Sequence, residues 1–253
     1  AAAYEQALAL YAQLKDWRGA AQVMERYLPN LVTDDDKVAT LRDLAVLQEQ
    51  RLGQKHVAFL QYCRALQIVP TEQSIRDQVE RLAQETESYE ELAAVYEEIA
   101  DGLPRGPLAE HLYVTLARVN DRFLDDAQAA EAAWRKILEF DPTNEQALSG
   151  LVELFGRRGH FKEYIESIEQ KLEATTSVEQ RKSMLREMAR VYEEHLSDPT
   201  QAERTLVRSL EMQADPETLM LLASLQRRQK NHAAVASTLL RLRDSVASAE
   251  DRS

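Results

Sequence analysis

The sequence predicts an all-α protein of the α-solenoid class, a stack of about seven helix pairs. Three observations favour this fold. An apolar pattern recurs every 33 to 38 residues, helix-forming residues dominate the composition, and turn-forming residues lie at matching places in every repeat. A period in this range is typical of repeat proteins, in which each unit buries its apolar face against its neighbours.

The recurring pattern, here called the register, defines one helix of each pair. A small or apolar residue is followed four positions later by a bulky apolar residue, and after four more by another apolar residue. This spacing places all three on one helix face. The seven sets are Ala20/Met24/Leu28, Ala58/Tyr62/Leu66, Leu92/Tyr96/Ala100, Ala130/Trp134/Leu138, Tyr164/Ile168/Leu172, Ala202/Leu206/Leu210 and Val235/Leu239.

Composition and charge agree with a helical array and exclude other classes. Of the 253 residues, 44% are hydrophobic, and only seven are Gly and seven Pro. Ala, Leu, Glu, Gln and Arg, all strong helix formers, are abundant. The apolar stretches are too short to span a membrane, so we expect no membrane insertion. The net charge of −12 argues against nucleic-acid binding, which needs a basic surface.

Short turns separate the two predicted helices of each pair. They contain Gly, Asp, Asn and Ser, which end one helix and cap the next. Between pairs, Pro70, Pro104 and Pro142 each follow a register residue by twelve positions, and we expect them at or just before the start of the next helix. The turns are centred on Asp16, Gln54, Ser88, Asp125, His160, Asp198 and Asn231.

The second-helix spacing A-x3-F…P resembles the second half of the tetratricopeptide repeat (TPR). The best matches are the segment from Ala130 to Trp134 with Pro142, and the segment from Ala58 to Tyr62 with Pro70. The resemblance covers nearly the whole chain. It implies a right-handed superhelix whose concave face, lined mainly by first helices, grips peptides or partner helices.

The chain also departs from the family pattern. No repeat carries the family's first-helix glycine, and Leu8, Val46 and Val152 stand at that position. We expect the paired helices to lie slightly further apart, because glycine permits close backbone approach. The 38-residue repeats need longer helices or longer loops. Divergent arrays of this kind are similar to those of large bacterial scaffold proteins, including myxobacterial gliding-motility proteins.

One segment interrupts the rhythm of the repeats. Residues 101–107 hold two of the seven Gly and two of the seven Pro. One interpretation is an ordinary loop between pairs, because loops are the usual place for both residues. The other is a hinge within one continuous solenoid, which would divide it into three helix pairs over residues 1–103 and four over residues 104–253.

The sequence offers no candidate catalytic or metal-binding site. The five histidines are dispersed and make none of the paired spacings that bind a metal on a helix. Cys63 is the one cysteine and has no base near it in sequence. Phosphate-binding glycine loops and nucleophile elbows are missing as well. We therefore predict a protein that is not an enzyme and needs no cofactor or metal.

Arginines are the candidates for partner binding. The inward TPR positions of the N-terminal half give a mixed, mostly acidic set that includes Asp77, Arg81 and Glu85. The C-terminal half gives mainly arginines, whose planar guanidinium groups bind carboxylates, and this predicts a trough for an acidic or phosphorylated segment. Alternatively, these arginines pair with neighbouring glutamates. The candidates are Arg118, Arg122, Arg157, Arg186, Arg190, Arg227 and Arg228.

These observations predict a protein–protein interaction scaffold that binds a partner peptide or helix on its concave face. The alternative is a structural spacer or a self-assembling strut within a larger multi-repeat protein. The chain begins without Met and inside a predicted helix, so we expect a segment of a longer chain or complex, with targeting signals outside it. The single cysteine fits a reducing compartment, and we expect the cytoplasm.

Overall fold

A computed structural model describes residues 2–250 of the chain, with side chains for residues 4–245. The outer ends of the two predicted domains, residue 1 and residues 251–253, lie outside the described residues. Within the described residues the chain forms fourteen α-helices and one short 3-10 helix, and no strand. The predicted all-α array of helix pairs is confirmed.

Each pair consists of a first and a second helix. The first helices are α1 (Ala2–Leu14), α3 (Asp34–Gln50), α5 (Gln73–Thr86), α7 (Pro107–Arg122), α9 (Glu145–Arg158), α11 (Val178–Glu194) and α13 (Pro216–Arg228). The second helices carry the register and are α2 (Trp17–Tyr27), α4 (Lys55–Ile68), α6 (Tyr89–Gly102), α8 (Ala127–Phe140), α10 (Phe161–Ala174), α12 (Pro199–Met212) and α14 (His232–Glu250). The 3-10 helix η1 (Leu28–Asn30) follows α2.

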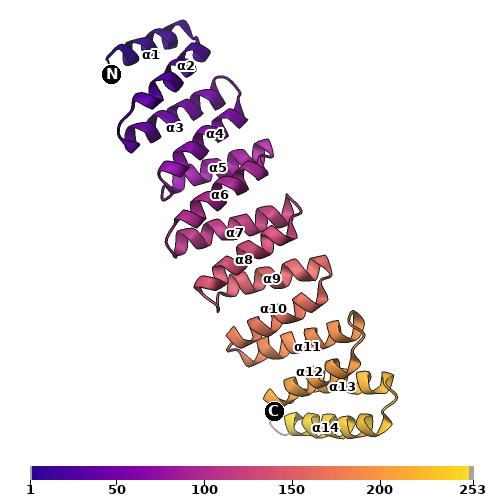
Figure 1. Cartoon of the computed structure of the whole chain (residues 1–253). Helices are drawn as coiled ribbons and strands as arrows, with labels where there is room; N and C mark the ends of the chain where they lie inside the picture. Colours follow the sequence, from indigo (N-terminus) through magenta and orange to yellow (C-terminus); the bar gives the residue numbers. More distant parts are fainter. Residues whose placement is uncertain (1, 251–253) are drawn as a thin grey trace. The chain divides into compact units, whose positions relative to one another are not determined.

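The chain divides into two compact units, residues 1–133 and residues 134–253, and the division falls inside α8. Within each unit the helices stack in chain order (Figure 1). A second helix packs against its own first helix and against the next one, as α4 does with α3 and α5, and α12 with α11 and α13. The boundary at 103/104 and the hinge at 101–107 stay predictions; residues 103–106 link α6 to α7.

The turn inside every pair contains one residue with positive φ. Such a left-handed residue ends a helix and lets the chain reverse. The residue after it caps the second helix, and in three pairs the cap is an aspartate, Asp16, Asp126 or Asp198, whose side chain accepts a hydrogen bond from a backbone N–H of the first turn. Each positive-φ residue precedes a register set by five positions; the seven are Lys15, Gly53, Glu87, Asp125, Gly159, Ser197 and Lys230.

The steps of the register alternate because the first helices alternate in length. The first helices α3, α7 and α11 have 17, 16 and 17 residues, whereas α1, α5, α9 and α13 have 13 or 14. The extra residues of the 38-residue repeats therefore lie partly in longer first helices and partly in the turns after them, which have four residues after α3, α7 and α11 but two after α5 and α9. Two consecutive pairs form the true repeating unit.

Each longer first helix is followed directly by a C-cap residue that stacks against the preceding pair. In each case the partner is the first residue of the preceding second helix, so the contact recurs once per two pairs. The three stacks are Arg51 over Trp17, with 5.1 Å from the guanidinium carbon to the ring centroid, Phe123 on Tyr89 with centroids 4.0 Å apart, and His195 on Phe161 at 3.9 Å. Flat side chains at these positions gain from π-stacking and cation–π attraction.

The register residues form the core between adjacent pairs. In the second unit Leu206 lies in a cluster with Leu210, Leu219, Leu222 and Leu225, which joins α12 to α13. Six of the seven central register residues are buried, namely Met24, Tyr62, Tyr96, Trp134, Ile168 and Leu206, whereas the seventh, Leu239 of α14, is exposed. Burying a side chain of this size contributes about 1.5–3 kcal/mol, so these contacts dominate the stacking.

A glycine permits one close approach that the sequence did not reveal. A Cβ atom on Gly150 of α9 would lie 2.3 Å from Cε2 of Trp134, so the indole packs directly on the α9 backbone. This glycine is not at the family's glycine position, because Gly150 lies two residues before Val152.

The expected position of the inter-pair prolines was wrong. Pro70, Pro104 and Pro142 lie three residues before α5, α7 and α9 begin, within the connecting segments. A proline there stops the preceding helix, because its ring and missing N–H do not fit a helix interior. The prolines that do begin helices are Pro107, Pro199 and Pro216.

The left-handed turns give a first prediction. Replacing Glu87 by Gly should raise the free energy of unfolding by about 1 kcal/mol, because Gly adopts positive φ without the steric cost that a side chain carries. Urea denaturation measures the change. In the control Glu90→Gly, inside α6, the same substitution should lower stability by about 1 kcal/mol. Equal losses at both positions would contradict the role of the turn.

The packing of Trp134 on Gly150 gives a second prediction. Gly150→Ala should destabilise the second unit by about 1–3 kcal/mol, because the added methyl overlaps the indole. Thermal unfolding followed by circular dichroism measures the loss. A Cβ on Gly102, at the end of α6, meets no atom within 4 Å, so Gly102→Ala should leave stability unchanged or raise it. A gain for Gly150→Ala would show that the close approach is not needed.

Candidate functional site: the face of the first helices

All seven predicted arginines lie on first helices, and they belong to both units. Arg118 and Arg122 lie on α7 in the first unit, exposed and one helical turn apart. In the second unit Arg157 lies on α9, where its Nε is 3.7 Å from Glu153 one turn away. The remaining four are Arg186 and Arg190 on α11, and Arg227 and Arg228 on α13.

A cavity of about 210 Å³ between α11 and α13 brings three of these arginines together, with α12 beneath it. Arg186, Arg190 and Arg228 stand on its rim, whereas Arg157 and Arg227 do not line it. The remaining lining residues supply apolar, acidic and hydroxyl groups: Ala189, Leu206, Leu221, Leu225, Glu193, Glu194 and Ser224.

The three arginines that line the cavity differ in whether they form ion pairs with acidic side chains. Arg186 lies 3.3 Å from Glu217 and 3.8 Å from Asp215, and it also donates to the Thr218 hydroxyl. Arg228 donates to Glu193 at 2.7 Å. Within the described part of the chain, Arg190 forms no ion pair, and it is exposed. The cavity is therefore not the plain arginine trough that the sequence predicted, because only one of its three guanidinium groups is unoccupied.

Beside this cavity, a buried ionic cluster joins α11 to the start of α13. The Lys182 ammonium, with only 3% of its side chain exposed, lies 3.0 Å from Asp215 and 3.3 Å from Glu179. Asp215 also caps α13, accepting hydrogen bonds from the backbone N–H and the hydroxyl of Thr218. Burial alone would raise the pKa of Asp215, but the hydrogen bonds from Thr218 and Lys182 outweigh it and hold the pKa below its ordinary value.

The sequence analysis missed this cluster. The order Asp215, Pro216, Thr218 is a recognisable helix start and could have identified the cap. The partner Lys182 lies 33 positions earlier, and no local pattern links it to Asp215.

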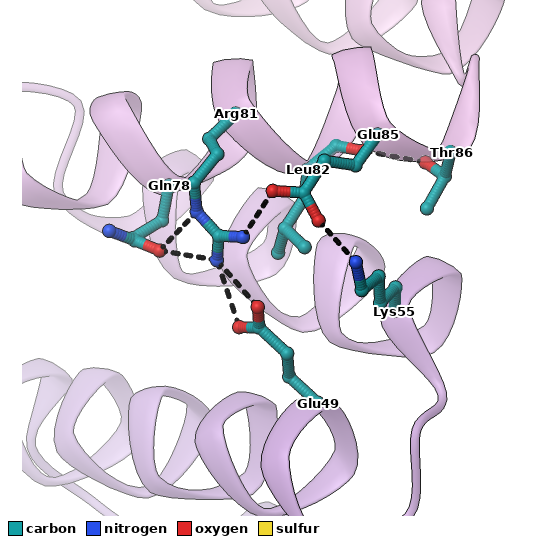
Figure 2. A network of polar contacts seen from close by, with 7 residues as sticks. All are labelled: Glu49, Lys55, Gln78, Arg81, Leu82, Glu85 and Thr86. Atoms are coloured by element: carbon teal, nitrogen blue, oxygen red, sulfur yellow. Dashed lines mark hydrogen bonds and ion pairs between the residues drawn. The ribbon is translucent and has the colours of Figure 1, made fainter.

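In the first unit, a polar network joins first helices α3 and α5 (Figure 2). Arg81 of α5 donates to Glu49 of α3 at 2.9 Å and to Glu85 one turn along at 2.8 Å. Lys55 of α4 also reaches Glu85, at 2.7 Å. The hydrogen bonds from Lys55 and Arg81 lower the pKa of Glu85. The predicted inward set around Arg81 thus forms internal ion pairs rather than offering free charge.

Two further cavities lie elsewhere and lack this combination of features. One of about 420 Å³ lies between α5 and the start of α7, rimmed by Arg76, Asp77 and His111. Another, of about 560 Å³, lies between the ends of second helices α8 and α10, beside Leu138 and Pro142. The cavity between α11 and α13 joins the largest number of the predicted arginines, so it is the candidate site.

Several other kinds of site find no support in the described residues. Among them, no three or more His, Cys, Asp or Glu side chains gather as a metal ion would require. Burial, followed by the nearby charge of Glu91, raises the pKa of the Cys63 thiol to about 12, so this cysteine is a poor nucleophile. None of the described helices is long and apolar enough to cross a membrane.

Comparison with protein-family models gives no match, and comparison with curated proteins gives none either. Solved structures do match. The structure of Naa15/Naa10 bound to HypK-THB aligns with 96% of this chain and 36% of its own, at 16% identity and a TM-score of 0.55. This chain thus spans about a third of that one. At such identity the likeness shows the fold alone.

Two other similar structures are described as TPR proteins. A tetratricopeptide repeat protein from Parabacteroides merdae aligns over 97% of this chain and 94% of its own, at 16% identity and a TM-score of 0.39. YrrB, described as a TPR protein with an unusual peptide-binding site, aligns over 83% and 100% at 13% identity and a TM-score of 0.42.

The buried cluster gives a prediction on pH. Asp215→Asn should cost about 3 kcal/mol at pH 7, because it leaves Lys182 buried without its closest carboxylate. The folded-state pKa of Asp215 lies below its unfolded value of about 3.9, so the ionised carboxylate stabilises the fold above that pH. This stability is lost as pH falls through the lowered folded pKa. Urea denaturation should therefore show the stability difference between the variant and the original protein shrinking as the pH falls below the unfolded pKa.

A matched control for this prediction is Glu217→Gln. Glu217 is exposed and pairs with Arg186, so its loss should cost about 0–1 kcal/mol. A difference between Asp215→Asn and the unaltered chain that persists unchanged at low pH would contradict the assigned ionisation of Asp215.

Proposed function

We propose that this chain, a divergent TPR array, is a non-catalytic protein–protein interaction scaffold. A peptide or helix of the partner binds the face formed by the first helices, which the TPR resemblance implies to be the concave one. The observation that carries the proposal is the cavity between α11 and α13, with buried apolar residues at its base and charged side chains at its rim. An apolar centre with a polar rim is the usual anatomy of a protein interface.

The physical basis of binding is a surface that exists before the partner arrives. Adjacent pairs hold α11 and α13 in place through the buried cluster around Leu206 and through the ion pair of Lys182 with Asp215. A preformed surface lowers the entropic cost of association, because fewer side chains and loops must be ordered. The first helices then contribute specificity and the second helices contribute stacking.

An acidic partner segment is the finer form of the proposal. It is supported by the exposed guanidinium of Arg190, which has no ion-pair partner among the described residues. We assign no role in this contact to Arg186 and Arg228, whose charges are already balanced by acidic neighbours. The reduced, buried thiol of Cys63 supports a reducing compartment, and we propose the cytoplasm.

A self-assembling strut within a larger multi-repeat protein is the second candidate. It is favoured by exposed leucines on the first and last helices, Leu10 and Leu14 of α1 and Leu239 and Leu240 of α14. Exposed apolar faces of this kind associate readily. Light scattering separates the candidates, because a strut forms oligomers without any partner, whereas the scaffold stays monomeric across a wide range of concentration.

Site-specific photo-crosslinking tests the scaffold directly. A photoreactive phenylalanine analogue at Met220, which is exposed on α13 beside the cavity without lining it, should capture a defined partner from the native cell extract. The same analogue at Arg204, exposed on second helix α12, is the matched control and should capture much less. Capture at Arg204 and none at Met220 would place binding on the other helix layer and contradict the proposal.

A further inference from the structure

The cavity between α11 and α13 has the size of a single apolar side chain. Its volume is about 210 Å³, and a cavity of about 150 Å³ already admits a benzene molecule. Ala189, Leu206 and Leu225 at its base are buried, and Leu221 is half-buried. A leucine, methionine or phenylalanine side chain of a partner would therefore fill it and displace water from apolar surface.

The charges around the cavity restrict what can accompany that side chain. Arg186 and Arg228 already face carboxylates, so a further acidic group would compete with Glu217 or Glu193 for them. Of the three arginines that line the cavity, only Arg190 has no ion pair with any side chain that the structure describes. One additional carboxylate is thus accommodated, and a long acidic run is not.

Glu194 sets the direction in which the carboxylate must lie. It is exposed at the end of α11, four residues after Arg190, where the helix dipole adds to its negative charge. An acidic group of the partner is repelled from this end of the cavity. It therefore lies toward Arg190 and the middle of α11.

A second apolar residue extends the surface along α13. Met220 is 54% exposed and precedes Ser224 by one turn, so the two share a helix face. Methionine is an adaptable contact residue at binding surfaces. The apolar part of the surface is therefore larger than the cavity itself.

We infer that this cavity binds a short peptide segment in which one bulky apolar side chain is accompanied by a single nearby carboxylate. The apolar side chain enters the cavity between α11 and α13, and the carboxylate accepts hydrogen bonds from Arg190. The inference rests on the proposed function and names the chemistry of its partner.

Selection from a library of random 12-residue peptides displayed on phage tests this inference on the full chain. Enriched peptides should carry Leu, Met, Ile or Phe within four residues of Asp or Glu. Synthetic copies are then titrated by fluorescence anisotropy. Changing the peptide carboxylate to its amide, or the apolar residue to Ala, should weaken binding about tenfold or more.

Three variants test the charged contact with Arg190 and the apolar contact in the cavity separately. Arg190→Glu should weaken binding at least tenfold, and a peptide with Lys in place of the acidic residue should recover affinity for this variant. Ser224→Phe should weaken binding by filling the cavity without changing charge. Arg204→Glu makes the same charge change on the exposed side of α12 and should leave binding unchanged. Circular dichroism confirms that all three variants fold.

The outcomes distinguish the inference from the proposed function. Enriched peptides that bind Arg190→Glu and Ser224→Phe as tightly as the original chain would overturn the inference and leave the scaffold intact. A library that yields no peptide above the bare surface would contradict both. Enriched peptides with acidic runs and no apolar residue would show that no apolar side chain anchors the partner in the cavity, and would overturn the inference.

Discussion

The burial of register side chains between successive helix pairs is the interaction on which this structure depends. A single pair of amphipathic helices cannot cover its own apolar face, so each second helix packs against the first helix of the next pair. Leu206 shows the arrangement most clearly, since it lies in one cluster with Leu219 and Leu222 of α13. Each such residue contributes about 1.5–3 kcal/mol, more than an exposed ion pair on the same surface.

The backbone at the turns makes this stacking repeat. A residue with positive φ lies in the turn after each first helix, and the register begins five positions later in all seven pairs. The helix lengths then alternate, and the longer first helices bring Arg51, Phe123 and His195 onto the preceding second helix. The array is thus a repeat of two pairs rather than of one. The side chains that face solvent on the first helices take no part in the turns or the stacking contacts, and they differ between the two units.

Sequence reasoning succeeded where a property is local and failed where it depends on distant residues. The register and the turns are short patterns, so they predicted the helices and their pairing. The placement of arginines on first helices was also correct, because it follows from the same period. Whether these arginines form ion pairs was not predictable, since the partners of Arg186 are Asp215 and Glu217, about 30 positions away. Gly150 was missed because its role depends on the ring of Trp134 in the preceding helix.

Hydrogen–deuterium exchange on the variant Leu206→Ala tests most directly whether neighbouring pairs hold one another in place. If stacking through the register is the main source of stability, the cavity left in α12 should speed exchange in α11, α12 and α13, with little change in α9. Faster exchange in α12 alone would contradict this account, because it would show that the first helices on either side are stable without the register contact.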